Sequence, residues 1–180
     1  KEMESFLRVM LTITKPKRIL ELGTAVGYSA ILMSEAIEKD ASIITIENYE
    51  KRIVQARDNF KKADKEDVIT MLEGDAMEIM PGLEGDSFDF VFMDAAKGQY
   101  LNFLPRVLEL LQPEGILISD NVLQDGDIIE SRFAVTRRNR TIHKRMREYL
   151  YTLTHSEELT TAVLPVGDGI TISTKKGRKA

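Results

Sequence analysis

The sequence predicts an α/β fold, in which a mostly parallel seven-stranded sheet carries helices on both of its faces. Short apolar runs typical of strands alternate five times with stretches of helical periodicity, and this order is that of parallel strands joined by crossover helices. Two further apolar runs are separated by the turn sequence Val166-Gly167-Asp168 and are expected to form an antiparallel edge. We expect a single domain over residues 1–180.

The composition is that of an ordinary soluble globule, 43% hydrophobic and 30% charged. No apolar run reaches the length of a membrane span and no signal peptide opens the chain, so a cytoplasmic location is expected. The absence of cysteine excludes disulfides, thiolate metal sites and a cysteine nucleophile. The net charge of −4 does not indicate a nucleic-acid binder. Because the chain begins without methionine and in a helical pattern, we expect natural N-terminal residues to be missing.

The first half of the chain alternates helices with strands. A helix over 2–14 is predicted because apolar residues recur there at helical spacing, and Lys15-Pro16 ends it since the residue before proline avoids the helical conformation. The strands that follow are short runs rich in isoleucine, valine and leucine. The expected elements are a strand at 19–22, a helix at 28–39, a strand at 42–46, a helix at 49–63 and a strand at 68–72.

The second half continues the alternation and closes with the two edge strands. A short helical turn at 77–80 ends at Pro81-Gly82, and the basic helix near the carboxyl end follows a long stretch without periodicity. The expected elements are a strand at 88–93, a helix at 100–111, a strand at 115–119, a loop over 122–137, a helix at 138–154 and strands at 159–165 and 169–173.

The chain is organised around a glycine turn between the first strand and its helix, Glu21-Leu-Gly23-Thr-Ala-Val-Gly27-Tyr-Ser29. Glycine has no Cβ, so a ligand can approach the backbone closely there. The order Glu-x-Gly-x-x-x-Gly is not the pyrophosphate-binding G-x-G-x-x-G, because the third glycine is missing and an acid precedes the first. The turn therefore predicts a ligand site of another kind.

Polar residues follow each of the first five strands, and the carboxyl ends of parallel strands meet at one edge of a sheet, where ligands bind. Glu47 lies twenty residues after Gly27 and is expected to accept both hydrogen bonds of a ribose diol; the alternative is a carboxylate near a helix N-terminus. Asp75 is expected to hydrogen-bond an adenine amine, or else to cap the next turn.

Asp94, Asp120 and Asn121 follow two strands that we expect to be neighbours. Two carboxylates and one amide oxygen are hard donors that suit Mg²⁺ or Mn²⁺, and two such carboxylates would repel each other without a cation. The alternative is that each of these residues caps a helix. Taken together, the three residues predict a metal site.

Lys97 and Tyr100 come shortly after Asp94. A lysine beside a divalent cation in a desolvated pocket loses its proton more easily than one in water, so Lys97 is the candidate base, although most lysines are solvated surface residues. Tyr100 either forms a wall of the pocket or packs in the core, and the sequence does not separate these two roles.

Three motifs, Glu21 to Ser29, Asp94-Ala-Ala-Lys97-Gly-Gln-Tyr100 and Asp120-Asn121-Val, resemble those of the cation-dependent class I O-methyltransferases of the catechol and caffeoyl-CoA type, O-methyltransferase family 3. The resemblance covers nearly the whole chain, including Pro165-Val-Gly-Asp-Gly-Ile170. It implies a Rossmann-like class I methyltransferase fold, S-adenosylmethionine as methyl donor, and often a homodimer. The residues it implies are Gly23, Ser29, Glu47, Asp75, Ala76 and Asp94 for the donor, Asp94, Asp120 and Asn121 for Mg²⁺ or Mn²⁺, and Lys97 as general base.

The segment from Arg132 to Arg147 is strongly basic and contains no acid. We expect its helix to bury one face, so that the cations project outward; such runs are usually solvated surface, but a run of one sign in an acidic protein also favours phosphate binding. The expected buried face is Ile142, Met146, Tyr149, Leu150 and Leu153, with His143 and His155 on the surface. The candidate RNA-binding residues are Arg132, Arg137, Arg138, Arg140 and Lys144.

Within the family, the Asp94–Tyr100 motif and Arg138-Asn-Arg140 look most like the bacterial tRNA 5-hydroxyuridine methyltransferases. The resemblance implies methylation of 5-hydroxyuridine at the tRNA wobble position, giving 5-methoxyuridine, with tRNA as partner. The alternative is O-methylation of a small catechol or other aromatic with two vicinal oxygens. A third reading, an RNA module that binds the donor without turnover, is disfavoured by Lys97 and the metal residues.

Overall fold

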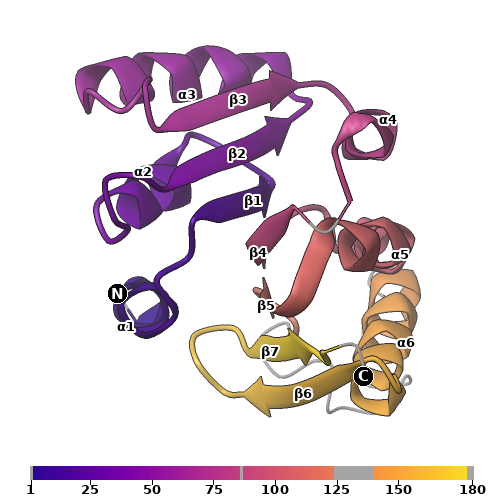
Figure 1. The fold of residues 1–180 in the computed structure, drawn as a ribbon. Coiled ribbons are helices and arrows are strands. Elements are labelled where there is room, and N and C mark those ends of the chain that lie inside the picture. The colour runs from indigo at the N-terminus through magenta and orange to yellow at the C-terminus, as the bar shows by residue number, and fades with distance from the viewer. Residues whose placement is uncertain (1, 86, 124–139, 178–180) are drawn as a thin grey trace.

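The computed structural model describes residues 2–85, 87–123 and 140–177. In this part of the chain the strands are β1 (Arg18–Leu22), β2 (Ser42–Glu47), β3 (Ile69–Glu73), β4 (Phe88–Met93), β5 (Leu111–Ser119), β6 (Leu159–Leu164) and β7 (Ile170–Lys175). They form one sheet in the order β3-β2-β1-β4-β5-β7-β6 (Figure 1). β1 to β5 are parallel, whereas β7 lies antiparallel between β5 and β6. The predicted mostly parallel sheet with an antiparallel edge is confirmed.

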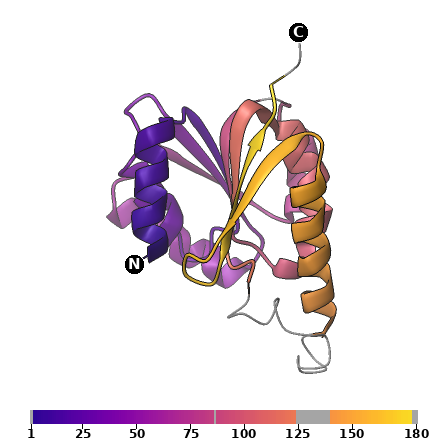
Figure 2. The ribbon, with the colours of Figure 1, turned by 90° about the horizontal axis from the view of Figure 1, so that it is seen from below.

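Helices cover both faces of this sheet, as predicted. The helices are α1 (Glu2–Thr14), α2 (Tyr28–Ser34), α3 (Glu50–Lys62), α4 (Ala76–Ile79), α5 (Tyr100–Leu110) and α6 (Arg140–His155), with 3₁₀ turns η1 (Met80–Gly82) and η2 (Lys97–Gln99). In Figure 2, α1 and α6 lie on opposite sides of the sheet. None of the described helices has the length and apolar character needed to cross a membrane.

The strands alternate their side chains between two buried cores, which is why they read as continuous apolar runs. Ile19 of β1 packs in the core formed with α1, α2 and α3, whereas its neighbour Leu20 packs in the core formed with α5 and α6. Val91 and Phe92 of β4 divide in the same way. Both faces of the central strands are therefore covered within the described residues.

Two element boundaries differ from the predicted ones by four residues or more. The helix expected over 28–39 ends at Ser34, because the Ala36 N–H donates to the Met33 carbonyl at 3.0 Å, a three-residue spacing that closes the last turn. The strand expected at 115–119 begins earlier, at Leu111, since Leu111 already pairs with Phe88 across an irregularity in the register. Neither change moves the carboxyl end of a strand.

The buried face of α6 was predicted wrongly at its first turn. His143 is 2% exposed, whereas Ile142 is 38% exposed. The buried stripe runs through His143, Met146, Tyr149 and Leu153 at spacings of three and four residues, and Ile142 lies about 100° away from it around the helix. His155 is exposed, as predicted. The expected loop over 122–137, from residue 124 on, and Arg132, Arg137 and Arg138 lie outside the described residues.

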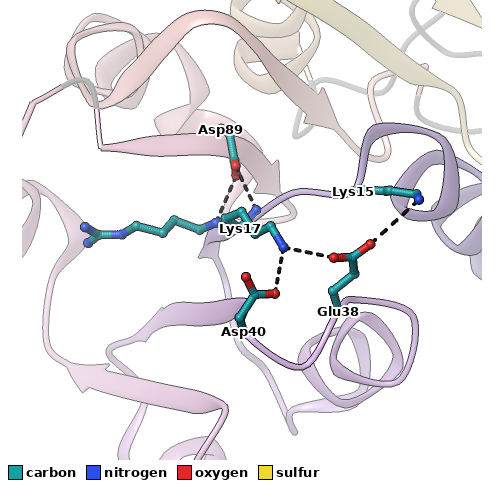
Figure 3. Close-up of polar contacts among 6 residues, drawn as sticks. Lys15, Lys17, Glu38, Asp40 and Asp89 are labelled. Atoms are coloured by element: carbon teal, nitrogen blue, oxygen red, sulfur yellow. Dashed lines mark hydrogen bonds and ion pairs between the residues drawn. The ribbon is translucent and has the colours of Figure 1, made fainter.

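The amino ends of β1 and β4 are joined by a polar network, drawn in Figure 3. The Asp89 carboxylate accepts the backbone N–H of Lys17 at 2.7 Å and that of Arg18 at 3.0 Å. The Lys17 ammonium donates to Glu38 at 2.9 Å and to Asp40 at 2.6 Å. This network holds the amino end of β1, which lies at the opposite end of the strand from the carboxyl ends that carry the predicted site residues.

Candidate active site

The carboxyl ends of the parallel strands meet at one edge, as the sequence predicts. Leu22 pairs with Ile46 on one side and with Met93 on the other, and Met93 pairs with Ser119. A cavity of about 620 Å³ opens at this edge, and a second one of about 260 Å³ shares part of its wall. The first is lined by the predicted residues Gly23, Glu47, Asp75, Ala76, Asp94 and Lys97, and the second by Gly23, Ser29, Asp94 and Asp120.

The glycine turn after β1 is needed for packing as well as for ligand access. Gly23 has φ +99°, and a Cβ on it would lie 2.2 Å from the carbonyl oxygen of Asp94. Gly27 has φ +84°, and a Cβ there would lie 2.5 Å from the ring of Phe60. Both glycines therefore let the turn approach neighbouring elements more closely than a residue with a side chain would.

Glu47 is held beside this turn by backbone donors. Glu47 is 6% exposed. Its Oε2 accepts the N–H of Ala25 at 2.8 Å, and its Oε1 accepts the N–H groups of Asn48 at 3.1 Å and Tyr49 at 3.0 Å. Each carboxylate oxygen has two lone pairs, so both lone pairs of Oε1 are used and Oε2 can accept one further hydrogen bond from a ligand in the cavity. The structure thus combines the two alternatives for Glu47, a contact with the start of α3 and a place in the cavity wall.

Asp75 caps α4. Its side chain accepts the N–H of Met77 at 2.8 Å, which is the capping alternative, and both Asp75 and Ala76 also line the larger cavity. Contact with an adenine amine stays a prediction for this residue.

Glu21 is a buried acid beneath the turn, to which the sequence reasoning gave no role. The hydroxyl groups of Ser29 and Thr45 both donate to its carboxylate, and the hydroxyl oxygens of Thr24 and Thr45 are 2.6 Å apart. Burial raises the pKa of Glu21 to about 7, although these hydrogen bonds act in the opposite direction. When Glu21 is ionised, the Ser29 hydroxyl group donates to it, so the Ser29 oxygen is left as an acceptor, which suits an ammonium group. The signal in the sequence was an acid inside an apolar strand.

Asp94, Asp120 and Asn121 come together as predicted. The amide Nδ2 of Asn121 donates to Asp94 Oδ1 at 3.1 Å, and the backbone N–H of Asn121 donates to Asp120 Oδ1 at 2.7 Å. Asn121 has φ +56°, a left-handed conformation that asparagine tolerates better than most residues. The sharp turn after β5 thereby directs both Asp120 and Asn121 toward Asp94.

The chemistry of these three side chains fits a hard divalent cation. Burial and then the charge of Asp94 raise the pKa of Asp120 to about 6, and burial is also the main cause that raises the pKa of Asp94. A cation between these carboxylates would remove their repulsion. Within the described residues, no three or more His, Cys, Asp and Glu side chains are grouped so that they could hold a metal, so a cation at this position would also need the Asn121 amide oxygen.

Lys97 begins η2 and lines the larger cavity, where its charge favours the ionised forms of Asp94 and Asp120. The turn that carries it is held from α6, because the Arg145 guanidinium donates to the carbonyl of Gly98 at 2.8 Å. Arg145 is a cation of the basic segment whose role the sequence did not indicate, since no pattern connects residues 47 positions apart.

Tyr100 packs beneath the site and does not line either cavity. Its buried hydroxyl group donates toward the carbonyl oxygens of Asp120 at 3.0 Å and Met93 at 3.2 Å, and its ring meets Tyr149 edge-on at 5.3 Å. Tyr100 therefore fixes the backbone of the strand ends that carry the candidate metal ligands.

Among the candidate RNA-binding residues, Lys144 is the one whose side chain is described. It is exposed and pairs with Glu148 on its own helix at 3.5 Å. Arg140 begins α6, and its side chain, like the other three candidates, lies outside the described part of the chain. The outward projection of these cations stays a prediction.

Comparison with known proteins shows the family to which this chain belongs. The family model of the O-methyltransferases matches residues 1–176. The chain is 35% identical over 128 residues to a catechol O-methyltransferase of Niastella koreensis, covering 69% of this chain and 58% of that protein. It is 33% identical over 176 residues to caffeoyl-CoA O-methyltransferase 1 of Eucalyptus globulus, covering 93% of this chain and 70% of that protein.

A solved structure is similar over almost the whole chain. The SAH-bound methyltransferase PaMTH1 from Podospora anserina superposes with a TM-score of 0.87 at 31% identity, covering 97% of this chain and 78% of that one. The chain thus spans 58% of the catechol relative's length and more of the others. With this fold, these strand ends and an end-to-end family match, the chain belongs to the O-methyltransferase family, whose members are S-adenosylmethionine-dependent enzymes.

Proposed function

We propose that this protein transfers a methyl group from S-adenosylmethionine to a hydroxyl oxygen of a small aromatic compound with two vicinal oxygens, such as a catechol. The observation that carries the proposal is the meeting of Asp94, Asp120 and Asn121 beside a cavity of about 620 Å³. Such a volume is typical of a cofactor pocket. The names of the relatives, catechol and caffeoyl-CoA O-methyltransferases, support the small aromatic acceptor.

We assign the donor to the larger cavity. Glu47 would accept a ribose hydroxyl group through the lone pair that its backbone partners leave open on Oε2, and Asp75 and Ala76 would contact the adenine. Ser29 and Asp94, in the wall of the smaller cavity, would accept hydrogen bonds from the ammonium group of the methionine part. When bound, the donor supplies the methyl group of its sulfonium sulfur, and S-adenosylhomocysteine is the leaving group.

We assign Mg²⁺ or Mn²⁺ to Asp94, Asp120 and Asn121. A metal held by these residues would supply positive charge that lowers the pKa of an acceptor hydroxyl group beside it. Lys97 accepts the hydroxyl proton, and the walls shared by the two cavities orient the acceptor oxygen toward the methyl group. Positioning and electrostatic stabilisation then contribute most of the rate acceleration.

Three changes test this assignment of roles. Lys97→Ala is expected to lower kcat for catechol by about 10²-fold or more while leaving the affinity for S-adenosylhomocysteine nearly unchanged, since a general base acts after binding. Asp120→Asn, or EDTA, is expected to abolish turnover and also to spare binding of that product. Calorimetry and a methylation assay measure both quantities. Full activity in EDTA would exclude the metal site, and wild-type kcat in Lys97→Ala would exclude this base.

The tRNA acceptor is the second candidate, favoured by the single-signed basic segment. The 5-hydroxyl and 4-carbonyl oxygens of 5-hydroxyuridine are vicinal, as in a catechol, and a looped-out anticodon base is accessible to a protein. Arg138→Glu with Arg140→Glu is expected to leave catechol methylation unchanged. Methylation of 5-hydroxyuridine in tRNA by the wild type, lost in this variant, together with no turnover of catechols, would replace the small-aromatic proposal. Mass spectrometry of tRNA nucleosides provides the measurement.

A further inference from the structure

The turn between β6 and β7 contacts the segment that follows the candidate metal ligands. The backbone N–H of Val122 donates to the carbonyl of Gly169 at 2.9 Å, and that of Leu123 donates to the carbonyl of Asp168 at 2.9 Å. Val122 is fully buried by this contact and its surroundings. Residues more than 40 positions away in sequence thus lie directly against the turn of Asp120 and Asn121.

The same segment is anchored on its other side by β4 and α5. The backbone N–H of Asp120 donates to the Met93 carbonyl at 2.9 Å, and the Tyr100 hydroxyl group donates to the Asp120 carbonyl at 3.0 Å. Asn121 lies between these two sets of contacts with φ +56°. A left-handed residue other than glycine costs about 1 kcal/mol or more and persists only where its surroundings fix it.

Gly169 is the residue that makes the approach possible. It has φ +81°, and a Cβ on it would lie 2.2 Å from Cγ and 2.5 Å from Cβ of Leu123. Contacts this short force a shift of the segment that carries Leu123. Gly167 in the same turn also has a positive φ, +53°, but a Cβ on it would meet nothing within 4 Å. An alanine at position 167 therefore tests the cost of a left-handed backbone alone, whereas an alanine at position 169 also tests the contact with Leu123.

We propose that the β6–β7 turn, through Gly169 and its backbone hydrogen bonds to Val122 and Leu123, is a positioning element that holds Asn121 against Asp94. This inference rests on the proposed function, because it assigns the turn a role in the metal site of that reaction. Gly169 acts here through Leu123 and Asn121 and touches no reacting atom. The turn belongs to the sequence Pro165-Val-Gly-Asp-Gly-Ile170, which by itself indicates no chemical role.

Gly169→Ala compared with Gly167→Ala tests the proposal on the full chain. For Gly169→Ala we expect Mn²⁺ affinity, measured by electron paramagnetic resonance, to fall about tenfold or more, as when a residue supporting a metal ligand is lost. Hydrogen exchange of the Val122 and Leu123 amides is expected to accelerate, because both donors lose their partners. The affinity for S-adenosylhomocysteine should change less than about twofold. Gly167→Ala is expected to match the wild type in all three measurements.

A double-mutant cycle keeps the test decisive if Gly169→Ala folds poorly. Leu123→Gly removes the three atoms that an alanine at 169 would meet, so Gly169→Ala combined with Leu123→Gly is expected to bind Mn²⁺ within about threefold of Leu123→Gly alone. A double variant as impaired as Gly169→Ala would overturn the role of this contact. Equal exchange rates and Mn²⁺ affinities in Gly169→Ala and Gly167→Ala would overturn the positioning role itself.

Failure of the proposed function gives a different result. If the wild type binds no Mn²⁺, or binds it equally well after Asp120→Asn, the metal site is refuted and with it the role of the turn toward a metal. Amide exchange at Val122 and Leu123 still distinguishes the glycine variants in that case, so a loss of the hydrogen bonds is recorded independently of metal binding.

Discussion

Glu21 is a residue whose chemistry is set by the fold around it. It is fully buried beneath the glycine turn, where two hydroxyl groups donate to it and no cation is among the causes of its pKa, which is raised to about 7. At a pH between the pKa of the unfolded chain and that of the folded protein, Glu21 is protonated in the folded protein and ionised in the unfolded chain. Stability is therefore lost as the pH rises from about 4.5 to about 7.

Glu21→Gln removes this dependence. Relative to the wild type, the variant is expected to gain up to about 3 kcal/mol in free energy of unfolding between pH 5 and pH 8, because the neutral amide does not become charged in the core. Urea denaturation of both proteins at the two pH values measures the change, and groups common to both cancel in the difference. The same stability difference at pH 5 and pH 8 would show that Glu21 does not titrate in this interval.

The site residues that could be predicted from sequence are those that follow strands. Asp94, Asp120 and Asn121 meet because parallel strands place their carboxyl ends at one edge, a rule that needs no knowledge of side-chain packing. The pairing of Ser29 with Glu21 could not be predicted in the same way. It depends on how the first turn of α2 sits over β1, which is decided by the tight packing of the two glycines.

At the scale of elements, α6 supports the turn that carries Lys97. Arg145 reaches from this helix to the carbonyl of Gly98, one residue after the candidate base Lys97. The sequence identified the basic segment but assigned its cations to a partner, because charge in a sequence does not show which side chains the protein itself uses. For the same reason the sequence did not show that His143 is buried and Ile142 exposed, because this depends on how α6 packs on the sheet.

Arg145→Met is expected to lower kcat about tenfold, because η2 loses a fixed hydrogen bond and Lys97 is less well oriented. The affinity for S-adenosylhomocysteine should change little. Arg147→Met is the matched control, since Arg147 is exposed two residues further along the same helix. Methylation kinetics and calorimetry on both variants make the comparison, and equal kcat in the two would remove Arg145 as a positioning residue for Lys97.

At the scale of the whole molecule, the two ends of the sheet have separate roles. The fold class, the seven strands and the edge that carries the site followed from the alternation of strands and helices, since periodicity reports burial directly. The position of β7 between β5 and β6 could not be predicted from this alternation, because strand order at an antiparallel edge depends on packing between residues distant in sequence. The Lys17 network lies at the other end of the sheet, among exposed side chains.

Lys17→Gln is therefore expected to change neither kcat nor donor affinity. Its ion pairs with Glu38 and Asp40 should contribute to stability near neutral pH, where the raised pKa of Lys17 and the lowered pKa values of both acids keep all three groups charged. The denaturation midpoint is expected to fall slightly at low salt and to match the wild type near 1 M salt, where such pairs are screened. A changed affinity for S-adenosylhomocysteine would contradict this separation of the two ends.

The place of β7 in the sheet has a consequence for the order in which the protein matures on the ribosome. Domains begin to fold from the amino end as the chain emerges, and β1 to β5 with their helices come first. β6 is made before β7, yet its sheet neighbour is β7, so it must wait for the last strand to insert beside β5. A nascent chain released before Asp168 would already contain every candidate ligand, while the backbone carbonyls that hold their loop would not yet have been synthesised.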